Sequence, residues 1–177
     1  SFVKRDHELM QAYSEGKLAM EDYMAFSMEP MLGRTPEEVD HLVGPWVEHY
    51  IEPIIFSDAT STISADRKAG DRILVISASG THLVAPIAKR LGIDEILGIE
   101  LQVEHGFYTG KTQGVLTYRE GKVTRLLDWL DQEEENLEGA SFYSDSRNDL
   151  PLLLKVDYPH VVNPDPVLRE HAEKNGW

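Results

Sequence analysis

The feature that most constrains the fold is a short apolar run near the middle of the chain. Residues 73–76 read Ile-Leu-Val-Ile, after a Gly-Asp turn and before Ser-Ala-Ser-Gly. A continuous run of β-branched and aliphatic residues is typical of a strand buried on both faces, and such strands belong to parallel sheets covered by helices. The sequence therefore predicts an α/β fold built around this strand.

Segments with strand and helix patterns alternate from that run to the end of the chain. The expected elements are a helix at 83–91, a strand at 95–101, a glycine-rich hairpin or flap at 101–118, a helix at 123–130, a strand at 141–143, a short helix at 150–156, a strand at 160–162 and a helix at 167–175. This alternation predicts a Rossmann-like, mostly parallel sheet flanked by helices.

The first third of the chain has helical patterns. Thr35-Pro36-Glu37-Glu38 is a strong helix start, because Thr35 can cap, Pro36 fits the first helical position and Glu38 completes a capping box. Upstream, methionines recur at helical spacing: Met20, Met24, Met28 and Met31. This stripe predicts either packing between helices or an adaptable lid over a ligand, since methionine is a flexible gap-filler.

Composition excludes several function classes. Seventeen Lys and Arg against thirty-one Asp and Glu give a net charge of −14, which repels nucleic acid. No membrane span or secretory pattern is present in the sequence, so we expect a cytoplasmic protein with no membrane partner. With no cysteine, metal chemistry must use carboxylates, carbonyls or histidine, and oxygen ligands favour Mg²⁺ or Ca²⁺.

Polar residues follow two of the expected strands, where ligands bind in open α/β sheets. After the first strand, Ser77 to Gly80 offer two hydroxyls and small residues ahead of a helix. A helix N-terminus with free N–H groups binds anions well. The segment predicts either an anion site or a simple helix cap.

The strand at 141–143 ends in Ser144-Asp145-Ser146-Arg147-Asn148-Asp149. Asp145 and Asp149 lie four residues apart across a turn, so both carboxylates can converge on a hard cation. The alternative for these acids is an N-cap and a first-turn residue that favours the helix dipole.

Lys122 stands at the start of the helix that precedes this strand. A lysine there opposes the helix macrodipole. It is either a solvated surface residue or an ammonium that pairs with a phosphate and with the metal-binding acids.

These elements, in this order, resemble motifs two, three and four of the haloacid dehalogenase-like phosphatases. The closest match is the phosphoserine-phosphatase-like branch with a helical cap, which includes histidinol-phosphatase-type members. The matching segments are Ile76-Ser77-Ala78-Ser79, Glu120-Gly121-Lys122-Val123 and the run from Tyr143 to Pro151, with further similarity at 163–166 and 176–177.

The resemblance implies roles for individual residues. Ser77 and the backbone at Ala78 would contact the transferring phosphoryl group, and Lys122 would neutralise its charge. Asn148 would hold the phosphate, while Asp145 and Asp149 would bind Mg²⁺. A helical cap at 1–55 would choose the substrate above a core at 56–177, with Arg34, Met24 and Met28 as candidate substrate contacts.

One family element is missing from these residues. The family carries Asp-x-Asp after its first, central strand, between the strands that end at Ser77 and Asp145. No Asp-x-Asp precedes Ser77 here. We therefore expect either a fragment of a longer protein or a first strand supplied separately or lost to disorder or cleavage. These residues alone are expected to be inactive by the family mechanism.

The predicted function is Mg²⁺-dependent hydrolysis of a small-metabolite phosphomonoester through an aspartyl-phosphate. Phosphoserine and histidinol phosphate are the substrate candidates implied by the resemblance. The alternative is a catalytically inactive relative that binds phosphate or acts as a scaffold. Loss of a central strand would also expose strand edges, which favours a homodimer.

Overall fold

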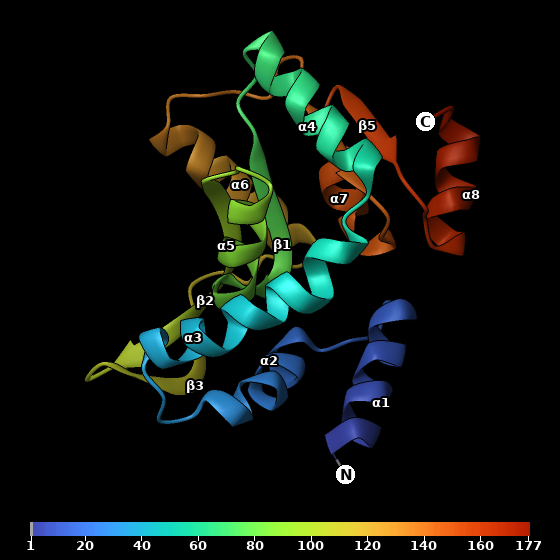
Figure 1. Cartoon of the computed structure of the whole chain (residues 1–177). Helices are drawn as coiled ribbons and strands as arrows, with labels where there is room; N and C mark the ends of the chain where they lie inside the picture. The colour runs from blue at the N-terminus through green and yellow to red at the C-terminus, as the bar shows by residue number, and fades with distance from the viewer. Residues whose placement is uncertain (1) are drawn as a thin grey trace. The chain divides into compact units, whose positions relative to one another are not determined.

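The computed structural model describes residues 2–177, and its contacts divide the chain into two compact units. The central unit is Ser27–Leu116, and the terminal unit joins Ser1–Phe26 to Thr117–Trp177. Figure 1 follows the chain through both. The boundaries of these units differ from those of the expected cap at 1–55 and core at 56–177, and that expected division stays a prediction. Its first residue, Ser1, lies outside the described residues.

The central unit contains a three-stranded sheet in the order β1-β2-β3. Strand β1 (Leu74–Gly80) runs parallel to β2 (Glu95–Glu104), and helix α5 (Thr81–Arg90) makes the crossover between them. Every residue of β1 is half-buried or buried. The apolar run at 73–76 therefore forms the predicted strand, and the following helix is confirmed as well.

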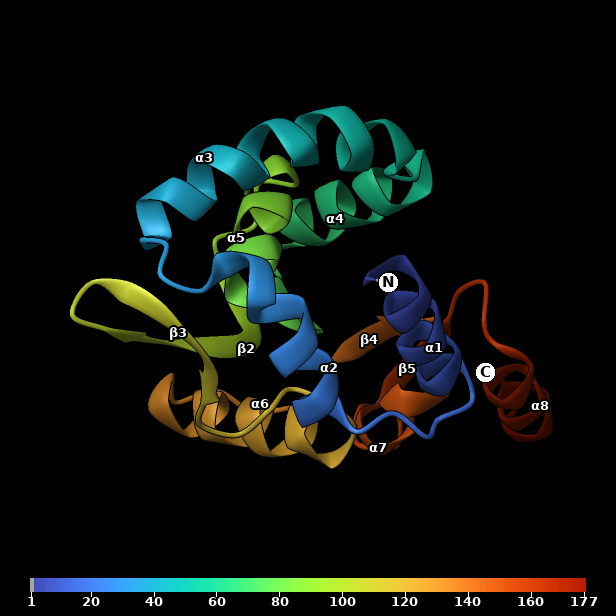
Figure 2. The same ribbon diagram turned by 90° about the horizontal axis from the view of Figure 1, so that it is seen from below.

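Strand β3 (Phe107–Gln113) pairs antiparallel with β2, so the predicted hairpin at 101–118 is confirmed (Figure 2). The turn is made by His105 and Gly106, both at positive φ. On its other side, Tyr108 donates its N–H to Arg34 O at 2.9 Å and accepts from Gly33 N at 3.2 Å. These bonds fasten the hairpin to the segment that follows the 3₁₀ turn η1 (Glu29–Met31).

Helices fill the rest of the central unit. Helix α3 (Pro36–Trp46) begins at the predicted capping box, in which Thr35 and Glu38 exchange side-chain-to-backbone bonds. The chain continues through a π-helical turn, η2 (Val47–Ile51), and a 3₁₀ turn, η3 (Glu52–Ile54), into α4 (Ser57–Ala69). Helix α4 ends at Gly70, whose φ of 92° is the left-handed conformation that glycine adopts without strain.

The terminal unit contains a second, two-stranded sheet. Strands β4 (Ser141–Ser144) and β5 (Tyr158–Val161) are parallel and in register from Ser141 opposite Tyr158. The helices of this unit are α1 (Phe2–Ser14), α6 (Glu120–Gln132), α7 (Leu150–Leu153) and α8 (Pro166–Asn175), and the 3₁₀ turn η4 (Arg147–Asp149) lies between β4 and α7. Helix α7 ends earlier than the sequence predicted.

Parallel strand pairs joined through helices in both units confirm the predicted α/β class. The strands form two separate sheets. Among residues 2–177, β1 is hydrogen-bonded to β2, and β4 is hydrogen-bonded to β5. No helix in that range is long and apolar enough to span a bilayer.

The methionine stripe falls on α2 (Met20–Met28) and on the turn after it. Met20, Met24 and Met28 are 3%, 2% and 0% exposed, and Met31 is half-buried. Such complete burial supports the packing interpretation of the stripe over the interpretation as a lid.

Candidate functional site

A buried ion pair lies where β4 gives way to η4 in the terminal unit. Lys122 Nζ is 2.7 Å from Asp149 Oδ1, and the two side chains are only 7% and 10% exposed. The second oxygen, Asp149 Oδ2, accepts a 2.7 Å hydrogen bond from Ser144 Oγ. Charges removed from water are tolerated only when they are paired in this way. Lys122 is therefore not a solvated surface lysine.

Asp145, between β4 and η4, is exposed. Its carbonyl oxygen accepts from Asp165 N at 2.9 Å, which holds the backbone in place. Across residues 2–177 its carboxylate makes no hydrogen bond or ion pair with the protein. This carboxylate is a hard oxygen donor that remains available to an external cation.

Asp165 fastens the η4 turn to α8. It caps α8 by accepting from Val167 N and Leu168 N, and it accepts from Arg147 N at 2.5 Å. Desolvation opposes ionisation, but these hydrogen bonds and the Arg147 guanidinium, 3.3 Å away, hold the pKa of Asp165 below its usual value. Asp165 is thus an anion at neutral pH, and its hydrogen bonds hold the η4 turn against the start of α8.

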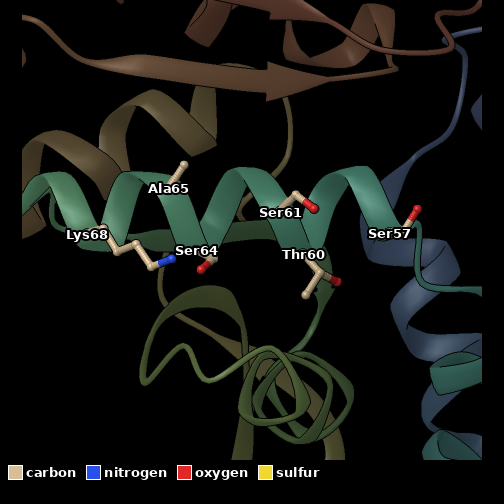
Figure 3. Close-up of a pocket in the computed structure, with 6 residues that line it drawn as sticks. All are labelled: Ser57, Thr60, Ser61, Ser64, Ala65 and Lys68. Carbon is tan, nitrogen blue, oxygen red and sulfur yellow. The ribbon is translucent and has the colours of Figure 1, made fainter.

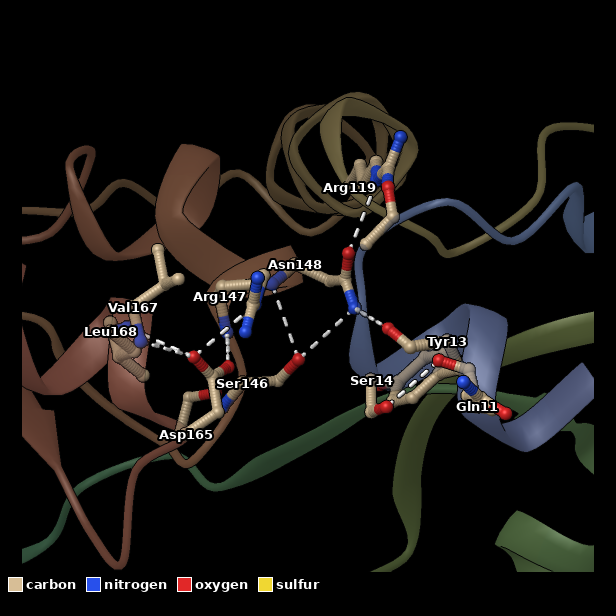
Figure 4. Close-up of polar contacts among 12 residues, drawn as sticks. Gln11, Tyr13, Ser14, Arg119, Ser146, Arg147, Asn148, Asp165, Val167 and Leu168 are labelled. Atoms are coloured by element: carbon tan, nitrogen blue, oxygen red, sulfur yellow. Dashed lines mark hydrogen bonds and ion pairs between the residues drawn. The ribbon is translucent and has the colours of Figure 1, made fainter.

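Asn148 is the centre of a polar network that also includes α1 and the start of α6 (Figure 4). Its Oδ1 accepts from Tyr118 OH at 3.3 Å and from Arg119 Nε at 3.2 Å. Its Nδ2 lies 3.3 Å from Ser146 Oγ and 3.5 Å from Tyr13 O. Both ends of the amide are engaged by protein, so its predicted contact with phosphate stays a prediction.

Asp149 has the positions that the cap interpretation predicts, as a first-turn acid of η4 and the N-cap residue of α7, but its carboxylate makes no capping hydrogen bond. The N-cap of η4 is Ser146, whose hydroxyl accepts from Asn148 N at 3.2 Å. Asp149 precedes α7 without a capping hydrogen bond from its side chain. The carboxylates of Asp145 and Asp149 are therefore not used for helix capping.

The end of β1, in the central unit, is built differently. Ser77 Oγ accepts from Ser79 N at 3.2 Å, and the N-cap of α5 is Gly80, which has no side chain to cap with. His82 is 7% exposed, and burial lowers its pKa against a smaller opposing effect of Asp40. The serines do not cap α5, so the anion-site interpretation remains. Ser77 and Ala78 belong to the central unit and Lys122 to the terminal unit, so the prediction that they share one phosphate site stays a prediction.

The predicted substrate contacts are dispersed. Arg34 is exposed in the central unit, and its Nε donates to Pro30 O at 3.0 Å. Met24 and Met28 are buried on α2. Their roles in substrate selection stay predictions.

The donor set for a metal is incomplete within the described chain. Residues 2–177 contain no cluster of three or more His, Asp or Glu side chains that could hold an ion. Each oxygen of Asp149 already has one protein partner, and the carboxylate of Asp145 has none in residues 2–177. The predicted role of Asp149 as a metal ligand stays a prediction, since each of its oxygens keeps a further lone pair. The corner fits part of a Mg²⁺ site, and further ligands must come from elsewhere.

A surface pocket lies on one face of α4, and none of the predicted site residues lines it. It is lined by Ser57, Thr60, Ser61, Ser64, Ala65 and Lys68 (Figure 3). Lys68 is its single titratable group. This lining has none of the paired acid and base groups that chemistry on a substrate requires.

Residues 3–154 match the family model of the haloacid dehalogenase-like hydrolases. The chain belongs to that family. The resemblance carried by Ser77, Lys122 and Asp145 is thereby confirmed at the level of the family.

Several members of this hydrolase family are similar to the chain in sequence. A histidinol-phosphatase of Neisseria meningitidis is 34% identical over 177 residues, which cover 98% of this chain and 80% of that protein. A probable phosphatase of Mycobacterium tuberculosis is 36% identical over 140 residues, or 79% of this chain and 48% of the relative. A phosphoserine phosphatase of the same organism is 36% identical over 109 residues and is matched over 35% of its length. The last two relatives are matched over less than half of their length.

Solved structures agree with the hydrolase fold. A protein of unknown function from Bordetella pertussis has a TM-score of 0.90 and 32% identity, covering 98% of this chain and 79% of that one. A phospho-aspartyl intermediate analogue of phosphoserine phosphatase has a TM-score of 0.68 at 24% identity, covering 94% and 77%. The second likeness shows the fold alone.

Sequence reasoning missed three residues that contact the η4 turn, Tyr13, Tyr118 and Arg119, and it named Ser144 without giving its hydroxyl a role. Tyr13 and Tyr118 have ring centroids 6.2 Å apart, and burial raises the pKa of Tyr13. Arg119 was detectable as a cation three residues before Lys122. Tyr13 gave no such signal, because more than a hundred residues separate it from the rest of the network.

Proposed function

We propose that this protein hydrolyses a phosphomonoester of a small metabolite. The observation that carries the proposal is the buried Lys122–Asp149 pair at the turn that also carries Asp145, whose carboxylate has no protein partner in residues 2–177. Phosphoryl transfer needs positioning and charge stabilisation more than covalent chemistry from side chains. A shielded ammonium and an available carboxylate at one turn suit a site where a phosphate dianion meets a metal cation.

Each residue then has one task. Lys122 neutralises the charge on the phosphoryl oxygens, and Asp149 holds its ammonium in place. Ser77 Oγ and the N–H of Ala78, near the end of β1 and ahead of α5, bind phosphoryl oxygens. Asp145 provides an oxygen ligand for Mg²⁺, which when bound polarises the phosphoryl group as a Lewis acid.

The nucleophile in this proposal is an aspartate that lies outside these 177 residues. Its carboxylate attacks phosphorus while the second aspartate of the Asp-x-Asp motif gives its proton to the ester oxygen, which leaves as the alcohol. The second aspartate then takes a proton from the water that attacks the aspartyl phosphate, which releases inorganic phosphate and restores both aspartates. Two observations support this assignment. Strand β1 has β2 as its hydrogen-bonded neighbour in residues 2–177, so its other edge can accept a further strand. The matched Neisseria relative is also longer than the matched region.

Histidinol phosphate is the first substrate candidate and phosphoserine the second. The choice is supported by the names of the relatives, since the histidinol-phosphatase matches 98% of this chain and the phosphoserine phosphatase 62%. The net charge of −14 also suits a substrate that carries an ammonium group.

The test uses the full-length protein, expressed from the gene with any codons that precede Ser1. Phosphate release is measured for histidinol phosphate, phosphoserine and glycerol phosphate, with Mg²⁺ and with EDTA. We expect turnover that needs Mg²⁺ and a kcat/KM at least about tenfold higher for one amine-bearing substrate, which corresponds to about 1.4 kcal/mol. Binding of inorganic phosphate without turnover of any ester would instead establish the inactive, phosphate-binding alternative.

A further inference from the structure

We infer that Arg119 is a positioning residue of the proposed site, acting through Asn148 to align Lys122 with the turn that carries Asp145. The inference rests on the proposed function. It starts from the contacts within the terminal unit, where one arginine side chain joins three segments that are distant in sequence.

The backbone of Arg119 is in an unusual conformation. Arg119 is the N-cap of α6, with φ of 52° and ψ of −124°. Non-glycine residues rarely adopt positive φ, and such strain persists only where the surroundings enforce it. Glycine would occupy this position without strain. An arginine at this position therefore indicates that its side chain is needed there.

The side chain has three contacts. Arg119 Nη2 donates to Gly16 O in the connection between α1 and α2, and Nε donates to Asn148 Oδ1 at 3.2 Å. The guanidinium carbon lies 4.9 Å from the ring centroid of Tyr118. Figure 4 shows Arg119 above the Asn148 amide, with the end of α1 on the far side of that amide. A planar guanidinium can serve two acceptors in fixed directions, which a lysine ammonium cannot.

Two parallel links result between the start of α6 and η4. Arg119 bonds to Asn148, and three residues later Lys122 bonds to Asp149. One link would leave the helix free to turn about a single contact. Two links fix the direction in which the Lys122 ammonium projects relative to Asp145, which stands three residues before Asn148.

The test compares three variants of the full-length protein. Arg119→Gly removes the side chain and relieves the backbone strain, so the protein should stay folded. Arg119→Lys keeps the charge and the aliphatic stem. Glu134→Gly is the matched control, because Glu134 is an exposed residue at φ of 55° whose N–H bonds to Asp131 O at the end of α6. Melting temperatures and steady-state phosphate release are measured for each.

We expect Arg119→Gly and Arg119→Lys to lower kcat about 10- to 100-fold, the range for residues that orient site ligands, with KM changed less than about threefold. Added guanidinium ion should restore part of the kcat of Arg119→Gly only. Glu134→Gly should match the wild type. A folded Arg119→Gly or Arg119→Lys protein with kcat within twofold of wild type would overturn this inference and leave the proposed function standing. A full-length wild type without turnover would overturn the proposed function and this inference with it.

Discussion

The two strand ends that the family resemblance singles out are built in opposite ways. At the end of β4, Lys122 and Asp149 are buried and bonded to each other, and the turn is tied to α8. At the end of β1, Ser77 Oγ accepts a hydrogen bond from Ser79 N, and small residues lead directly into α5. The first end is a preorganised charge pair, and the second is a half-buried set of backbone and hydroxyl groups. Breaking the ion pair at the first end should therefore cost stability, and removing the Ser77 hydroxyl at the second should cost substrate binding.

Lys122→Ala should give the largest effect. Removal of the ammonium leaves the Asp149 carboxylate buried and unpaired, so the free energy of unfolding should fall by about 3 to 5 kcal/mol. Urea denaturation measures the change. Lys4→Ala on α1 is the control, because Lys4 is 79% exposed and should be replaceable without cost. Equal stability of the two variants would remove the contrast between the strand ends.

Asp145→Asn should affect activity and leave stability nearly intact. The Asp145 carboxylate has no bonding partner in residues 2–177, so unfolding should change by less than about 0.5 kcal/mol. Loss of a metal ligand should lower phosphate release at least about 100-fold, beyond the usual cost of losing a residue that only orients a ligand. The stabilisation that Mg²⁺ gives the wild type in thermal unfolding should also disappear. A variant still stabilised by Mg²⁺ would show that the ion binds elsewhere.

Gly80→Ala tests how tightly the end of β1 is packed. A Cβ at this position would lie 2.5 Å from His82 Nδ1, so the buried ring must move. We expect a loss of about 1 to 3 kcal/mol in unfolding free energy, as for other overpacked sites. In a His82→Ala background the same substitution should cost much less. Equal costs in both backgrounds would show that His82 is not the obstacle.

Ser77→Ala should give the smallest effect. Loss of one hydrogen bond to a charged phosphate is worth about 1.5 kcal/mol at the lower end, or roughly tenfold in kcat/KM. Steady-state kinetics on the preferred substrate measure this change, and Thr60→Ala on α4 is the control hydroxyl. An unchanged kcat/KM for Ser77→Ala would exclude Ser77 from the phosphate site.

Much of the fold was predictable because local patterns decide it. The β-branched run at 73–76, the capping box at Thr35 and the glycines of the 101–118 hairpin each specify one local structure. The arrangement of the strands in two sheets could not be read from those patterns, since it depends on which strands pair.

The candidate site was predictable where its residues follow each other in sequence. Asp145 and Asp149 lie in one turn of the sequence. Lys122 was recognisable as a candidate because a lysine at the start of a helix is unfavourable to the helix dipole. The contacts of Asn148 with Tyr13 and Arg119 were not predictable, because they join residues 135 and 29 positions apart in the chain. The burial of Lys122 could not be foreseen either, since a lysine is usually exposed.

The central claim is that the buried Lys122–Asp149 pair serves phosphate chemistry and is not needed for folding. Replacing both partners, as Lys122→Met with Asp149→Asn, removes the charges together and leaves no unpaired ion. The decisive measurement is phosphate release by this folded double variant of the full-length protein. We predict stability within about 1 kcal/mol of wild type with turnover below about one hundredth of it. A folded double variant that turns over substrate at the wild-type rate would contradict the account.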